Sequence, residues 1–250
     1  MIKDPYVYEG TDVLINKLNI RDSEKLDKAE SDFASLAISQ LRNEDFKIDS
    51  IFDLLEIHRR LFSALYDWAG KPRTINIYKA EPLLGGKSID YVFASYIDTA
   101  LKELQKEFAT TDWGSLNPSK KIEKVCYFVS EFWHIHPFRE GNTRTSAMAL
   151  YFLIKKTGLH VNIGFLSRNG KFFRNALVLS CLYSSSKTGY LLGIVTDSVT
   201  LKNEISGKYE TIEGTEVKKY SYSHHTTNKL ETIKRRPTGN EFLLNLALRS

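Results

Sequence analysis

The chain has 250 residues, of which 42% are hydrophobic and 26% are charged, a composition typical of a globular protein with one large core. No apolar run is long enough to span a bilayer and no secretory stretch follows the first residues, which argues against membrane and secreted proteins. The net charge of +5 is spread along the chain, so we expect neither a nucleic-acid nor a membrane partner. Cys126 and Cys181 stand among apolar residues, which favours buried thiols and a cytoplasmic location.

The first seventy residues predict an extended start and two helices. Residues 6–18 read as the extended segment, and apolar residues then recur at helical spacing from about Asp22 onward. A second helix is expected after Asp49 and Ser50, ending at residues 67–70.

Residues 73–89 interrupt this helical pattern. Polar and apolar residues alternate over 73–78 in the manner of a strand, and Gly85 with Gly86 then gives a turn signal. This pattern predicts a short β-hairpin or flap.

The helical pattern resumes after the flap. It predicts a long helix over about 90–108, and a further helix that starts at Asn117 with proline at its first position. Later helices are expected from Gly141 onward, near 170–182 and near 187–201. The predicted fold class is therefore mainly α.

Beyond residue 205 the composition changes. Residues 208–217 predict a small hairpin, and residues 221–236 form a polar tail. We therefore expect a catalytic domain over 1–205 and a small C-terminal extension over 206–250.

The segment from His136 to Arg144 combines residue types that suit phosphate chemistry. Pro137 stops the preceding helix and favours an extended conformation at His136, so that its imidazole can project from a loop as a general base. Phe138 is expected to anchor that loop in the core, with the charged side chains that follow facing outward.

The second half of this segment predicts an anion site. Gly141 precedes a helix whose first backbone N–H groups and positive end attract phosphate. Arg144 lies in the first helical turn, and Glu140 beside the glycine suggests Mg²⁺ held between protein and phosphates. Each residue alone has an ordinary structural explanation, and it is their joint order that favours a catalytic site.

At these residues the chain resembles the Fic family. The run HPFREGNTR is similar to the family signature HPFx[DE]GNxR, and residues 58–74 resemble the helix and the entry to the flap in Fic proteins. The similarity extends over roughly residues 6–200. It implies a Fic-type helical bundle, with an active-site loop at 136–144 and a flap at 73–89.

The resemblance also implies a reaction and the roles of individual residues. A Fic protein of this kind moves AMP from ATP to a Tyr, Thr or Ser hydroxyl of a target protein and releases pyrophosphate. His136 would be the general base, Glu140 would hold Mg²⁺, and Arg144 would contact the β-phosphate. The full set of residues expected to bind the nucleotide is Arg139, Gly141, Asn142, Thr143, Arg144 and Asn175.

Partners follow from the same resemblance. The flap would hold an extended segment of the target by backbone pairing. Self-modification, a separate inhibitor protein and a homo-oligomer are further expectations, in a bacterial cytoplasmic setting.

The sequence departs from the family pattern in three respects. Thr143 stands where many members have glycine, and Ala147 stands where many have a second arginine that helps hold the γ-phosphate. No clean copy of the inhibitory motif [ST]xxxE[GN] is present. We therefore expect no autoinhibition of the usual kind and a weaker hold on the γ-phosphate.

Two alternatives stay open at this point. A branch of the superfamily transfers phosphate instead of AMP, but it has a bulkier residue where Gly141 stands. A catalytically weakened Fic module that only binds a partner is the other alternative. A zinc site at His134 and His136 is disfavoured, because no third ligand stands at a suitable spacing.

Overall fold

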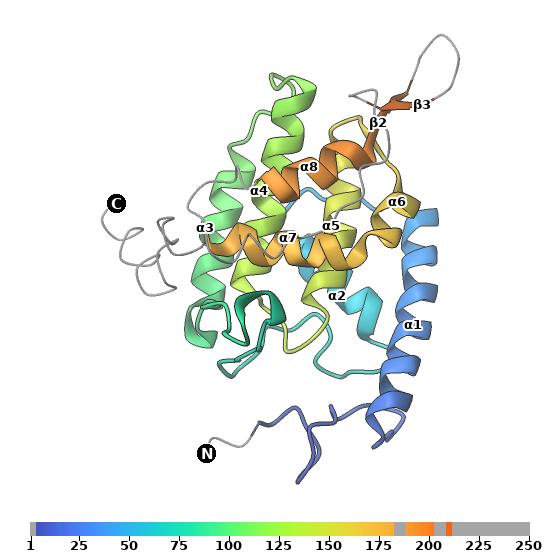
Figure 1. The fold of residues 1–250 in the computed structure, drawn as a ribbon, viewed down its shortest axis with the longest axis vertical. Helices are drawn as coiled ribbons and strands as arrows, with labels where there is room; N and C mark the ends of the chain where they lie inside the picture. The colour runs from blue at the N-terminus through green and yellow to red at the C-terminus, as the bar shows by residue number, and fades with distance from the viewer. Residues whose placement is uncertain (1–3, 183–188, 203–208, 212–250) are drawn as a thin grey trace.

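The computed structural model describes residues 4–182, 189–202 and 209–211, and these form a helical bundle with one small sheet at its edge (Figure 1). The fold is mainly α, as predicted. The α-helices are α1 (Ser23–Asn43), α2 (Asp53–Phe62), α3 (Ile97–Ala109), α4 (Pro118–Ile135), α5 (Asn142–Lys156), α6 (Ile163–Arg168), α7 (Gly170–Leu182) and α8 (Gly189–Ser198).

Helices α4 and α5 form the centre of the bundle. Helix α4 contacts α3, α5, α7 and α8, while α2 joins α5 to α1 at the edge. Eleven of the eighteen residues of α4 are buried, and they include nearly every residue of its C-terminal half, as expected for a central element. The loop between α4 and α5 is therefore held by two buried helices.

The helix starts follow capping rules that can be read from the sequence. Asp22 caps α1 by accepting the Lys25 N–H, and Asn117 caps α4 by accepting the Lys120 N–H at 2.9 Å. These two predictions are confirmed. Helix α2 begins later than predicted, because the Asp53 carboxylate accepts the backbone N–H groups of residues 49 and 50 and holds them in a turn.

Residues 73–89 form the predicted flap without any β-strand, so the strand pairing expected for a β-hairpin is wrong. Its one regular element is a 3-10 helix, η1 (Pro82–Leu84). A few separate bonds close the loop: the Glu81 N–H donates to the carbonyl oxygen of Lys87 at 3.1 Å, and the Lys79 N–H donates to Ser88 Oγ at 3.2 Å. Side chains thus replace the backbone ladder that the alternation suggested.

The helix expected over 90–108 starts seven residues late, at α3, after a short 3-10 turn η2 (Ala94–Tyr96). The backbone before it is engaged with other parts of the chain. Arg73 donates to the carbonyl oxygen of Val92, and Asn76 Oδ1 accepts the Ala94 N–H at 2.8 Å. These bonds hold the segment against the flap instead of in a helix.

The sheet has the order β1 (His160–Val161), β2 (Val199–Lys202) and β3 (Tyr209–Thr211), with both pairings antiparallel. The hairpin predicted within 208–217 stays a prediction, because only residues 209–211 of that range are described. The structure pairs β3 with β2, which the sequence reads as the end of a helix. The polar tail over 221–236 lies outside the described residues. The division at residue 205 stays a prediction.

No helix in the described part of the chain is both long enough and apolar enough to cross a membrane.

Candidate functional site

His136 lies at the junction between α4 and the loop that leads to α5. Its backbone is left-handed, with φ 51° and ψ 58°, and its N–H still bonds the carbonyl oxygen of Phe132. The extended conformation predicted for it is therefore wrong: the residue caps α4 before Pro137 ends the helix. A positive φ is uncommon for a histidine and indicates a position fixed by its surroundings.

The hydrogen bonds of the His136 ring define its chemistry. Nδ1 lies 3.0 Å from the carbonyl oxygen of Trp133, and because a carbonyl only accepts, Nδ1 carries the proton. Nε2 is then a free lone pair, buried and without a partner among the described residues. Burial and the nearby charge of Lys79 hold the pKa of His136 well below 6.5, so the ring is neutral at physiological pH and suited to accept a proton.

Two aromatic rings enclose this base. The Tyr91 ring lies 4.0 Å from the His136 ring between centroids, and the Trp133 ring meets it edge-on at 5.2 Å. His136 itself is only 2% exposed.

The loop is braced from within by Asn142. Its side-chain Oδ1 accepts the Phe138 N–H at 3.0 Å, and its Nδ2 donates to the Phe138 carbonyl oxygen at 2.8 Å. Phe138 is fully buried, as predicted, and stacks on His58 at 3.6 Å between ring centroids. The Asn142 side chain is thus used by the loop itself, and a role in binding the nucleotide would fall to its backbone N–H.

His58 supports the same loop from α2. Its Nδ1 accepts the Gly70 N–H at 2.8 Å, so Nε2 carries the proton and donates to the carbonyl oxygen of Glu140 at 3.0 Å. Burial lowers the pKa of His58 to about 3. The ring is a neutral structural link between α2 and the loop.

Gly141 precedes α5 with φ 84°. A Cβ there would lie 2.5 Å from the Phe62 ring and 3.1 Å from His58 Nε2, so only glycine fits. It also provides no side-chain cap. The first backbone N–H groups of α5 therefore lack an intrahelical partner, which is the arrangement that an anion site needs, and anion binding there stays a prediction.

Glu140 turns toward the flap rather than outward, against the sequence expectation. One carboxylate oxygen accepts the Gly141 N–H at 3.0 Å and the other lies 2.8 Å from Lys79 Nζ. Burial alone would raise the Glu140 pKa, but the charge and hydrogen bond of Lys79 and the Gly141 N–H lower it to about 2. The carboxylate is ionised and already holds one cation.

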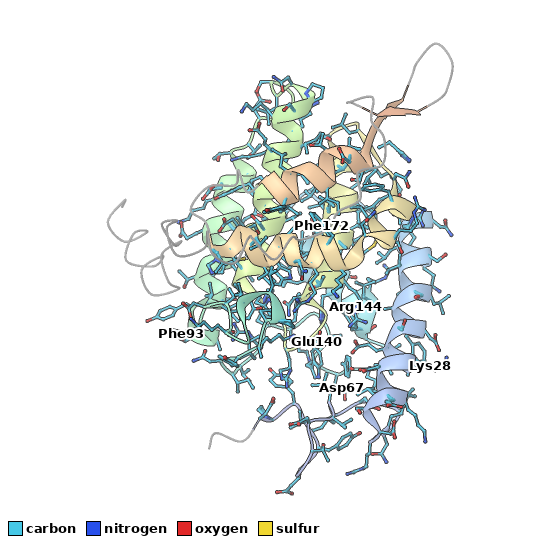
Figure 2. The ribbon with its side chains drawn as sticks, in the orientation of Figure 1. Lys28, Asp67, Phe93, Glu140, Arg144 and Phe172 are labelled. Carbon is cyan, nitrogen blue, oxygen red and sulfur yellow. The ribbon has the colours of Figure 1, made fainter. Side chains whose placement is uncertain are left out.

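Arg144 points from the first turn of α5 toward α1. Its guanidinium pairs with Glu30 and lies over the Phe62 ring, 4.7 Å from the centroid. Glu30 also accepts the Tyr66 hydroxyl. Figure 2 shows Arg144 and Glu140 on the same side of the bundle, near the flap.

Arg139 lies at the entrance to a cavity of about 510 Å³. Its Nε donates to Asp4 Oδ2 at 2.9 Å, and both residues line the cavity with residues 74–79 of the flap and with Ala94 and Ser95. Arg139 is half-buried, so the outward orientation expected for it is not observed.

The remaining predicted positions differ in what they do. Thr143 Oγ1 accepts the Trp133 Nε1–H at 3.1 Å, which ties α5 to α4. Ala147 packs on the core, so that position holds no cation for a γ-phosphate. Asn175 lies in α7 and makes no hydrogen bond with the loop within the described part of the chain, and its role stays a prediction.

Sequence reasoning missed the role of Arg73 in holding the loop. Its Nε donates to the His136 carbonyl oxygen at 2.9 Å and its backbone N–H donates to that of Pro137 at 2.7 Å. Burial lowers its pKa to about 10, which still leaves it charged at neutral pH. No local pattern indicates this role, because the bonds join residues more than sixty positions apart.

The side chains of this site suit Mg²⁺ only when the ion arrives bound to a nucleotide. No group of three His, Cys, Asp or Glu side chains that could hold a metal occurs in the ranges described. Mg²⁺ commonly binds through one or two carboxylates together with phosphate oxygens and waters. An ionised Glu140 beside the amides of α5 matches that mode, and the Lys79 ammonium shows that a cation is favourable there.

Comparisons with known proteins identify the family of the chain. The model of the Fic/DOC family matches residues 49–154. Protein adenylyltransferase VbhT of Bartonella schoenbuchensis is 32% identical over 163 residues, which cover 64% of this chain and 32% of that protein. Probable protein adenylyltransferase y4lH of Sinorhizobium fredii is 32% identical over 164 residues, which cover 64% of this chain and 80% of that protein.

Solved structures support the fold. BepC of Bartonella tribocorum, with bound AMPPNP, superposes with a TM-score of 0.65 at 22% identity, covering 79% of this chain and 97% of that one. The N-terminal Fic domain of an effector from Bartonella sp. AR 15-3 superposes with a TM-score of 0.64 at 24% identity, covering 78% of this chain and 90% of that one. The helical bundle is therefore shared with these domains.

Proposed function

This chain belongs to the Fic family, and from that premise we propose that it transfers AMP from ATP to a hydroxyl side chain of a target protein. The observation that carries the proposal is the buried Nε2 of His136, which has no hydrogen-bond partner among the described residues, in a loop that ends at the uncapped first turn of α5. The curated relatives are named as protein adenylyltransferases, which supports the same reaction.

The chemical step needs one base and one leaving group. The target hydroxyl oxygen attacks the α-phosphorus of ATP while His136 Nε2 takes the hydroxyl proton. The bond from the α-phosphorus to the bridging oxygen breaks, and pyrophosphate leaves with the electron pair. Positioned proton transfer of this kind contributes about 10²–10⁴-fold in rate, and placing the two reactants in line contributes further.

The nucleotide phosphates would lie at the start of α5. The backbone N–H groups of Asn142 and Thr143 would donate to phosphate oxygens, with Arg144 as the nearby cation. The Gly141 N–H, which donates to Glu140 Oε1 in the structure, would have to exchange that carboxylate oxygen for a phosphate oxygen. Since Arg144 is paired with Glu30, it would share its guanidinium between that carboxylate and a phosphate. Mg²⁺, held by Glu140, would neutralise phosphate charge when bound.

The flap would hold the target. No described residue accepts a hydrogen bond from the backbone N–H groups of residues 75–78, which leaves them free for an extended segment. They line the cavity that Arg139 borders, next to the loop of His136. A target chain bound there would bring its hydroxyl toward the base.

Further aspects rest on the family resemblance alone. Self-modification, a separate inhibitor protein, a homo-oligomer and a cytoplasmic location stay predictions, as does the division into 1–205 and 206–250.

The proposal is tested with ATP labelled either at the α-phosphate or at the γ-phosphate, by measuring which label is transferred to protein. Incubation with ATP labelled at the α-phosphate should label a protein in a lysate or the enzyme itself, and His136→Ala should abolish that label. Transfer from γ-labelled ATP alone would instead show phosphotransfer. A chain that binds no Mg·ATP by calorimetry would be a partner-binding module.

A further inference from the structure

The flap places a lysine on the carboxylate that is proposed to hold the metal. Lys79 Nζ lies 2.8 Å from Glu140 Oε2, and the two side chains are 25% and 36% exposed. The other oxygen of Glu140 is engaged by the Gly141 N–H. The ammonium therefore occupies the oxygen of Glu140 that is not already bonded to the loop backbone.

This pair closes the flap over the loop between two fixed anchors. At one end Arg73 bonds the carbonyl oxygens of His136 and Pro137. At the other end Glu81, whose side chain is fully buried, receives both guanidinium nitrogens of Arg174 at 2.8 and 2.9 Å. Lys79 lies between the anchors, and its ion pair ties this span to the catalytic loop.

A divalent cation on Glu140 would oppose this contact. Mg²⁺ binds carboxylate oxygens at about 2.0–2.1 Å, so an ammonium left at 2.8 Å from the same oxygen would be a close like charge. The repulsion favours release of the amine. A half-exposed ion pair is worth about 1 kcal/mol or less, so Mg²⁺ held by ATP phosphates can displace it.

We propose that Lys79 is a positioning residue: a tethered cation that occupies Glu140 until Mg²⁺ arrives and thereby couples the flap to the metal site. The inference rests on the proposed function, because it takes Glu140 as the metal ligand. When Mg·ATP is bound, the amine leaves Glu140 and this span of the flap loses its tie to the loop. The flap is then free to receive a target segment after the nucleotide has been loaded.

Lys79→Met tests the competition directly, with Lys87→Met as the matched control. Lys87 is an exposed lysine of the same flap, and it forms no ion pair with any residue that the structure describes. The Mg²⁺ concentration for half-maximal thermal stabilisation is measured at saturating non-hydrolysable ATP analogue. We expect Lys79→Met to lower it about three- to fivefold, in line with a weak ion pair, and Lys87→Met to leave it unchanged.

An unchanged or raised Mg²⁺ midpoint in Lys79→Met would overturn the proposal, since Lys79 would then be neutral toward the metal or assist it. The same titration separates this idea from the proposed function, because neither protein needs to transfer AMP. A wild-type chain that binds Mg·ATP but transfers no label refutes the proposed function only. AMP transfer with equal Mg²⁺ midpoints refutes the coupling only.

A second measurement covers the case in which Lys79→Met does not fold. Acetylation of lysine amines in the ligand-free protein is followed by mass spectrometry in wild type and in Glu140→Gln. Loss of the carboxylate charge should raise the labelling rate of Lys79 relative to Lys87 severalfold. Equal relative rates would show that Glu140 does not hold the amine, and the proposal would fail.

Discussion

The catalytic loop at 136–144 and the flap at 73–89 lie against one another but are built in opposite ways. In the loop, buried rings and paired hydrogen bonds fix almost every group, and His136 Nε2 is left free. In the flap, a few side-chain bonds join irregular backbone, and Tyr78 is 72% exposed. A rigid loop holds the catalytic groups in fixed positions. A flap with few backbone hydrogen bonds can instead adapt its conformation to a partner chain.

The largest expected effect lies at the base. His136→Ala should lower AMP transfer by about 10²–10⁴-fold, because the proposed general base is removed. Transfer is measured from α-labelled ATP at saturating Mg²⁺. His160→Ala, at an exposed histidine outside the loop, should leave the rate unchanged, and a comparable loss there would show that the assay reports stability rather than base catalysis.

The two regions differ most clearly in how they tolerate a methyl group. Gly141→Ala should destabilise the fold by about 2–4 kcal/mol, because the new Cβ overlaps the Phe62 ring and φ is positive. Gly85→Ala in the flap also has a positive φ but meets nothing within 4 Å, so it should cost about 1 kcal/mol. Denaturant unfolding compares the two, and equal losses would contradict the contrast.

A lower pH should reduce the free energy of unfolding, because three histidines are buried around the catalytic loop. Burial lowers the pKa values of His58, His134 and His136 below 6.5. As the pH falls, these histidines therefore become protonated in the unfolded chain before they do so in the folded chain. Stability is then full above about pH 6.5 and falls as the pH drops toward the folded-state pKa values, by about 1.4 kcal/mol per pH unit for each histidine. Unfolding free energies measured at pH 7.5 and 5.5 check this, and equal values would show that these rings are not buried neutral.

The smallest effect is expected on the flap surface. Tyr78→Ala should change the unfolding free energy by about 0.5 kcal/mol or less, because the ring is exposed and its hydroxyl makes one bond, to the Gly86 carbonyl oxygen. Chemical denaturation measures it. A loss as large as that of Gly141→Ala would mean that the flap is part of the rigid core.

Sequence reasoning succeeded where the cause is local. The helix starts at Ser23 and Pro118 follow from a capping residue, and the buried anchor Phe138 follows from its apolar ring in a loop where charged residues come next. The motif at 136–144 carries its residue types in one short run, so a candidate site could be named from the sequence, and the roles of its residues stay predictions.

The remainder depends on contacts between distant parts of the chain. Glu30 and Arg144 stand 114 positions apart, and Lys79 and Glu140 stand 61 apart. No periodicity indicates such pairs. The strand predicted in the flap is absent for the same reason. The alternation of polar and apolar residues is a local signal, whereas Arg73 and Asn76 bond to the catalytic loop and to the segment before α3.

Mass spectrometry of a lysate incubated with Mg·ATP tests the central claim most directly. Wild-type protein should add the mass of AMP to a Tyr, Thr or Ser side chain of at least one protein, and His136→Ala should add none. A phosphate adduct in place of AMP, or an AMP adduct that persists in His136→Ala, would contradict the assignment of His136 as the base for AMP transfer.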